Sequence, residues 1–179
     1  ITWTLPTNFG EGLVIVAAIL AGATLPITPL QILWINMTTA VLLGLMLAFE
    51  PVEKGLMHRP PRPPQAPILD RLLIGRIVLV SVLLLLGAYG LFLNELRQGH
   101  TLAEARTVAV NVFVVVETCY LFNCRSLTRS FVAVGLFSNP WVWVGSGFML
   151  GLQLLMTYLP AMNRVFGTAP IGIREWLMI

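Results

Sequence analysis

The chain has 179 residues, of which 57% are hydrophobic and 11% charged, and its formal net charge is +3. With a mean hydropathy of +0.85, a compact soluble globule of this length would expose large apolar patches, so the composition indicates an integral membrane protein with the lipid bilayer as its partner. The small positive charge lies mainly at the ends of apolar runs, which favours membrane orientation and argues against a nucleic-acid partner.

The first two apolar runs, at residues 1–24 and 30–49, are both long enough to cross a bilayer, which takes about 20 residues. A proline-containing turn at 25–29 joins them. Pro6 lies inside the first run and removes a backbone donor, so we expect a bend there or a free carbonyl at Thr2. Gln31 is near the start of the second run, where we expect a surface or hinge contact.

Both runs carry polar side chains three residues apart, namely Asn8 with Glu11 and Asn36 with Thr39, so each pair shares a helix face. Polar groups without partners are costly in hydrocarbon, so we expect these faces to turn toward each other or toward a polar path. Oxygen ligands of this kind suit hard cations. Two simpler roles remain open: the amides bonding across a helix pair, and the hydroxyl of Thr39 bonding to its own backbone.

The next connection, at residues 50–71, is hydrophilic, and its six prolines favour an extended path over a helix. Further apolar runs follow at 72–93, 105–123 and 140–160, and another helix starts at 173–179. The run at 105–123 has Glu117 in its interior, and an ionisable residue inside a span usually marks an ion or proton path. The sequence therefore predicts an all-α membrane protein with a bundle of five transmembrane helices plus the start of a sixth.

The basic residues are distributed unequally between the two sides of this predicted bundle. Seven of the eleven flank the proline-rich loop or lie in the connection that shares its side: Lys54, Arg59, Arg62, Arg71, Arg76, Arg125 and Arg129. Four lie on the opposite side: Arg97, Arg106, Arg164 and Arg174. The positive-inside rule therefore predicts a multi-pass protein whose proline-rich loop 50–71 is cytoplasmic.

Four stretches, in this order and at these separations, carry a family resemblance: PTNFGE, LQILWINMTTA, MHRPPRPPQAPI and VETCYLFNCRS. They resemble the C-terminal membrane half of P-type cation-transporting ATPases of the calcium-pump (type II) branch, from the fifth membrane helix to the first turns of the tenth. The resemblance implies that the whole of 1–179 is the transport domain of such a pump. It also implies ion-coordinating oxygens at five positions, namely Asn8, Glu11, Asn36, Thr39 and Glu117.

The same resemblance implies a transported cation as ligand, ATP and Mg²⁺ bound in cytoplasmic domains outside these residues, and further ligands from N-terminal helices of the same pump. One position departs from the pattern, because Ala40 stands where such pumps have an Asp after the Thr. Without the Asp carboxylate the site has up to two fewer oxygen ligands and one fewer negative charge. Sodium, another monovalent ion and a single divalent ion therefore stay open as the transported cation.

We therefore expect the membrane part of an ATP-driven cation pump, which by itself has no phosphorylated Asp or nucleotide site and does not hydrolyse ATP. The alternative is a self-contained passive channel or a secondary-transporter module lined by the same polar residues. Such a module would need an internal repeat, and the sequence shows none.

Overall fold

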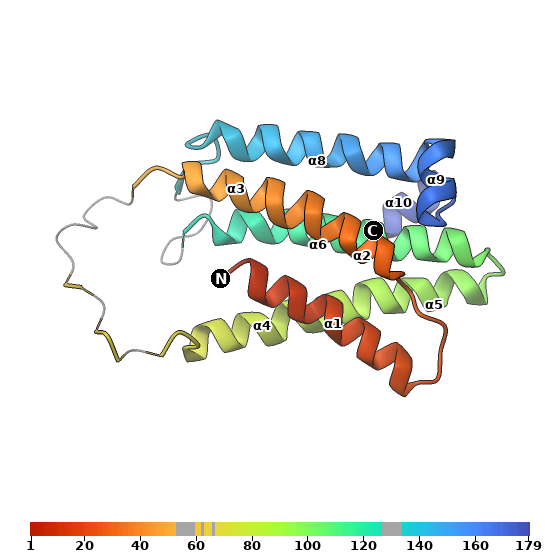
Figure 1. Ribbon diagram of the computed structural model, residues 1–179, viewed down its shortest axis with the longest axis horizontal. Helices are drawn as coiled ribbons and strands as arrows, with labels where there is room; N and C mark the ends of the chain where they lie inside the picture. The colour runs from red at the N-terminus through yellow and green to blue at the C-terminus, as the bar shows by residue number, and fades with distance from the viewer. Residues whose placement is uncertain (53–59, 62, 66, 127–133) are drawn as a thin grey trace.

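The computed structural model describes residues 1–52, 60–61, 63–65, 67–126 and 134–179. Every regular element in these residues is helical, and Figure 1 shows the long helices running side by side between two ends of a bundle. This arrangement confirms the all-α prediction.

Twelve helical segments make up the described part of the chain. The first five are α1 (Thr4–Leu20), α2 (Pro29–Ile35), the π-helical η1 (Asn36–Leu43), α3 (Gly44–Met46) and the 3-10 segment η2 (Leu47–Phe49). The other seven are α4 (Arg71–Leu84), the π-helical η4 (Leu85–Tyr89), α5 (Gly90–Arg97), α6 (Leu102–Cys124), α8 (Pro140–Tyr158), α9 (Pro160–Phe166) and α10 (Ile173–Met178).

Among the described residues, three continuous helical stretches are long and apolar enough to cross a membrane: Pro29–Phe49, Arg71–Arg97 and Leu102–Cys124. A fourth is formed if α8 and α9, which meet at 81°, are taken together. These stretches correspond to the spans predicted at 30–49, 72–93, 105–123 and 140–160. The run at 1–24 forms the 17-residue helix α1, which is shorter than expected, so its span stays a prediction.

Polar residues at the helix starts fix where several of these elements begin. The Thr28 hydroxyl accepts a hydrogen bond from the backbone N–H of Gln31 at 3.3 Å, and the Gln31 side chain accepts one from the backbone N–H of Thr28 at 2.9 Å. Gln31 is fully buried and its Nε2 donates to the Phe166 carbonyl at 2.8 Å, which ties α2 to α9. Of the two contacts expected at Gln31, the surface contact is therefore wrong, and the hinge contact stays a prediction.

Pro6 lies in the first turn of α1, where a helix needs no donor from it. The carbonyl of Thr2 accepts a hydrogen bond from the Tyr120 hydroxyl at 3.0 Å. The expected free carbonyl at Thr2 is therefore wrong, because this group ties the start of α1 to α6 instead.

The helix α6 has the most extensively buried sequence of the bundle, and α1 crosses α4 beside it. Gly10 allows the close contact between α1 and α4. A Cβ atom at this position would lie 2.5 Å from Leu84 Cδ1 and 3.3 Å from the Cα of Ser81. The close approach of α1 and α4 places the next residue of α1, Glu11, inside the bundle at 4% exposure.

The chain connections lie at two opposite ends of the bundle (Figure 1). The end of η2, the start of α4 and the end of α6 lie at one end, and the turns after α1, α5 and α9 lie at the other. At the first end the buried guanidinium of Arg125 donates from Nε to Glu50 Oε1 at 2.7 Å and from Nη2 to Ser138 Oγ at 2.6 Å. The topology residues Lys54, Arg59, Arg62 and Arg129, and with them much of the proline-rich loop, lie outside the described residues.

Candidate ion-binding site

Two carboxyl groups meet inside the bundle, one from α1 and one from α6. Glu11 is 4% exposed and Glu117 is 1% exposed, and their side chains lie close enough to interact with each other. Each has one carboxylate oxygen, Oε1 in both residues, that is buried without a hydrogen-bond partner. Like charges at this proximity in a medium of low polarity repel strongly, so the pair requires a cation or a proton between them.

The π-helical segment η1 provides the polar groups that border this pair. Asn36 begins the segment, and its Nδ2 donates to Glu11 Oε2 at 2.8 Å and to the Ile32 carbonyl at 3.2 Å. Thr39 is 1% exposed, interacts with Glu117, and donates its hydroxyl hydrogen to the Ile35 carbonyl at 2.8 Å. Since that hydrogen is already used, the lone pairs of the Thr39 oxygen stay available to a ligand.

The unusual winding of η1 fits a binding role. π-helical turns inside α-helices are rare and occur frequently at functional sites, because they rotate side chains away from the regular register. Here the segment runs from Asn36 to Leu43 and so contains both predicted polar residues, as well as Ala40. The backbone therefore departs from α-helical geometry where the predicted ligands lie.

A hydrogen bond from the indole of Trp3 supports the backbone at Glu117. Its Nε1 donates to the Glu117 carbonyl at 3.1 Å, and the Trp3 side chain is 3% exposed. This contact ties the first residues of the chain to α6 at the level of the carboxyl pair. Trp3 carries no chemical signal of such a role in the sequence, where it reads as an interfacial or packing residue.

Asn8 is the predicted site residue that the structure does not bring to the others. Its side chain is exposed and lines a hollow of about 320 Å³ with Ile1, Thr4 and Leu5. The buried positions of α1 follow a helical stripe that contains Thr7, Glu11, Val14 and Ala18, and Asn8 falls outside it. Four of the five predicted residues thus lie together.

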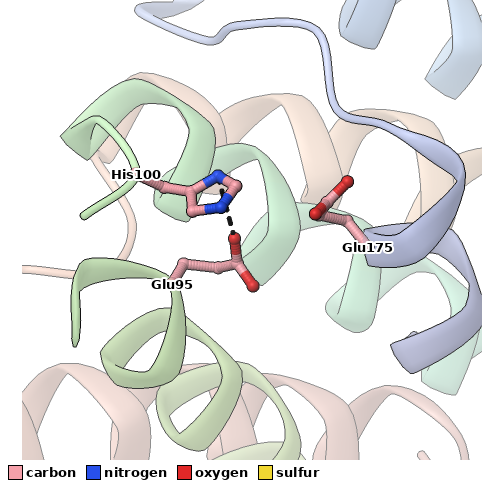
Figure 2. Close-up of side chains that lie close together, drawn as sticks. All are labelled: Glu95, His100 and Glu175. Carbon is pink, nitrogen blue, oxygen red and sulfur yellow. Dashed lines mark ion pairs between the residues drawn. The ribbon is translucent and has the colours of Figure 1, made fainter. Parts of the chain in front are cut away.

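Two other groups of buried polar residues were missed by sequence reasoning. Gln153 of α8 donates to Asn111 Oδ1 on α6 at 3.1 Å and accepts from Trp34 Nε1 on α2 at 3.2 Å. Glu95, His100 and Glu175 form the second group, at the end of the bundle where α5 turns into α6 (Figure 2). Trp34, Asn111 and Gln153 are too far apart in sequence for a spacing rule to connect them, and although Glu95 and His100 are only five residues apart, nothing in the sequence places Glu175 beside them.

Comparison with known proteins identifies the family to which the chain is similar. The model of the family described as cation transporting ATPase, C-terminus, matches residues 24–179. The probable cation-transporting ATPase F of Mycobacterium tuberculosis is 60% identical over 179 residues, which are 100% of this chain and 20% of that protein.

More distant relatives cover the chain just as fully. Cation-transporting ATPase pma1 of Synechocystis is 35% identical over 98% of this chain and 20% of its own length. The calcium-transporting ATPase of Bacillus subtilis is 30% identical over 100% of this chain and 20% of its own length.

The chain thus spans about a fifth of the length of these relatives. The matching residues include η1, α6 and every other element after α1. Together with several apolar helices of membrane-crossing length, they identify a multi-pass membrane protein. The chain belongs to the family of the cation transporting ATPase C-terminus.

Proposed function

We propose that this chain is the membrane part of an ATP-driven cation pump and that Glu11, Asn36, Thr39 and Glu117 contribute oxygen ligands to the transported cation. The observation that carries the proposal is the buried pair of carboxyl groups, each with an oxygen that no donor in the described residues reaches. Structural polar groups in a membrane interior normally find partners within the protein. Unused acceptor oxygens at this site are what a cation needs when it leaves its water shell.

Charge balance favours a single divalent cation at this site. Two carboxylates carry two negative charges, and the described part of the chain places the amide of Asn36 and the hydroxyl of Thr39 beside them, both uncharged. A calcium-sized ion takes six to eight oxygens. The remaining ligands would come from water, from Asn8 after repacking of its exposed face, and from N-terminal helices of the same pump.

In this proposal the energy source lies outside the chain. ATP and Mg²⁺ bind in cytoplasmic domains of the same protein, and the proline-rich loop 50–71 faces that side because of its basic residues. A single cysteine in place of the exposed Gln65 would then resist an impermeant thiol reagent added to intact cells, whereas one in place of Gln98 would react. Labelling at position 65 from outside would reverse the orientation.

The test of the site is cation-dependent phosphorylation by ATP in the full-length protein that carries this chain. Glu11→Gln and Glu117→Gln keep side-chain volume and remove one charge each. Since even partners of metal ligands change affinity about 10- to 100-fold when mutated, each variant is expected to raise the half-maximal cation concentration at least about tenfold.

The control for this test is Glu104→Gln, because it lies on the same helix as Glu117 and caps Thr101 in a manner that Gln also supports. It should keep the parent's cation dependence. Parent-like cation dependence in both Glu11→Gln and Glu117→Gln would show that these carboxyl groups are structural.

A further inference from the structure

A second group of acidic and imidazole side chains lies at the end of the bundle away from Arg125. Glu95 comes from the last turns of α5, His100 from the turn that follows, and Glu175 from α10, and Figure 2 shows the three side chains pointing toward one another. One ligand atom from each lies within 4.8 Å of the others. The nearest pair, His100 Nδ1 and Glu95 Oε2, is 3.4 Å apart.

Glu95 is the residue that calls for a ligand. Its side chain is 1% exposed, and within the described part of the chain neither carboxylate oxygen receives a hydrogen bond. Leaving a buried acceptor without a donor costs about 1–3 kcal/mol, and more when the group is charged. The carboxyl group points into the cluster (Figure 2), so an ion placed there would satisfy it.

The backbone holds the other two side chains in place. Gly99 has a φ of +87°, a conformation that L side chains rarely adopt, and the turn that it permits lets the backbone N–H of His100 donate to the Glu95 carbonyl at 3.1 Å. Glu175 Oε2 accepts a hydrogen bond from the backbone N–H of Gly172 at 2.7 Å, which fixes the position of the carboxylate and leaves Oε1 without this bond.

Neighbouring helices also fix the position of α10. The Tyr158 hydroxyl on α8 donates to the Ile171 carbonyl at 2.9 Å, and Trp176 Nε1 donates to the same hydroxyl at 2.7 Å. The cluster is therefore assembled before any ion binds.

From these contacts we infer that Glu95, His100 and Glu175 bind a divalent transition-metal ion of the zinc class, at a position distinct from the carboxyl pair of Glu11 and Glu117. Zinc binds both imidazole nitrogen and carboxylate oxygen, and a site with three protein ligands leaves the fourth tetrahedral position to water. Calcium and magnesium prefer oxygen ligands alone. With metal–ligand bonds of about 2.0–2.2 Å, ligand atoms in a tetrahedral site lie about 3.3–3.6 Å apart, which the 3.4 Å pair already matches.

The bound ion would join α10 to the turn between α5 and α6. These elements contribute ligands that are 75 positions apart, from His100 to Glu175, so the site closes a large loop of the chain. Glu104 Oε2 lies 4.0 Å from His100 Nδ1 but is already occupied by the backbone N–H and the hydroxyl of Thr101. It therefore stays a capping residue in this proposal.

The test measures Zn²⁺ binding to the full-length protein that carries this chain, purified in detergent, stripped with a chelator and dialysed against Zn²⁺ with excess Mg²⁺. The parent should hold one more equivalent of zinc than either Glu95→Gln or His100→Gln. The control compares Glu11→Gln with the double variant Glu11→Gln, His100→Gln. Adding His100→Gln should again remove one equivalent of zinc, which separates this site from the proposed transport site.

A second measurement needs no variant, because an ion that binds only the folded state raises the unfolding temperature. Zn²⁺ should raise the Tm of the parent, and Mg²⁺ at the same concentration should not. The inference is overturned if the Gln variants retain all the parent's zinc, or if zinc leaves the parent's Tm unchanged. In that case Glu95 and His100 form an ion pair without a metal.

Discussion

Among the single residues, Ala40 stands where the resemblance to calcium pumps implies an Asp. It lies in η1 directly after Thr39 and packs partly buried against the hydrophobic core. The replacement by alanine leaves Glu11 and Glu117 as the charged groups that face each other at the proposed site. The missing negative charge at position 40 should therefore limit the affinity of the site for a divalent ion.

Ala40→Asp is expected to strengthen calcium binding relative to sodium, because it adds a carboxylate beside the two that are present. We expect the half-maximal calcium concentration for phosphorylation to fall about tenfold while that for sodium changes less. Ala40→Asn provides the isosteric, uncharged control. An equal effect of Asp and Asn, or a calcium-to-sodium ratio unchanged by Asp, would mean that residue 40 does not face the ion.

Sequence patterns selected most of the residues that the structure brings together at the candidate site, because carboxylates inside apolar runs are conspicuous. Glu11 and Glu117 stand out without any knowledge of the fold. The spacing rule was less successful for Asn8, since a residue three positions from Glu11 is displaced by about 60° around an α-helix. That displacement is enough to move Asn8 from the buried stripe of α1 to its exposed face.

At the scale of elements, the contact between α1 and α4 depends on one glycine. A Cβ atom at Gly10 would meet both a side-chain atom of Leu84 and the backbone of Ser81, whereas at Gly12 it would meet nothing within 4 Å. Because Ser81 Cα cannot move without the helix, a methyl group at position 10 must push α1 and α4 apart. The displacement would also shift Glu11 relative to Glu117.

Gly10→Ala is therefore expected to lower the free energy of unfolding by about 1–3 kcal/mol, the usual cost of an overpacked contact. The matched change Gly12→Ala should be neutral or stabilising, since alanine favours a helix by about 1 kcal/mol over glycine. Thermal unfolding of both variants in the same detergent makes the comparison. If Gly10→Ala is as stable as Gly12→Ala, the helices are not held at this separation.

Hydropathy predicted the long helices well, since a span of some 20 apolar residues has few other structures open to it. It did not predict the π-helical segments η1 and η4, because an apolar run does not specify the helical winding; in the structure η1 packs against α6 and α8, and η4 against α1 and α6. For the sharp turn between α8 and α9, the signal in the sequence is Pro160, the first residue of α9.

At the scale of the whole molecule, the bundle contains two different kinds of polar site at different places. The carboxyl pair joins α1 to α6 beside η1, within the apolar part of the bundle, and the Glu95 cluster joins α5 to α10 at one end. The first kind suits an ion that must be bound and released, because the backbone of η1 beside it departs from regular α-helix. The second kind, with its three side chains held by turns and neighbouring helices, suits a permanent ion.

The most direct test of the account is equilibrium binding of radioactive calcium and sodium, without ATP, to the full-length protein and to its Glu11→Gln, Glu117→Gln double variant. We expect the parent to bind one of these cations at a defined stoichiometry. The double variant should lose this binding while remaining folded, as judged by an unchanged elution volume and helical content. Parent-like binding in the folded double variant would contradict it, and the transport site would then lie on other residues.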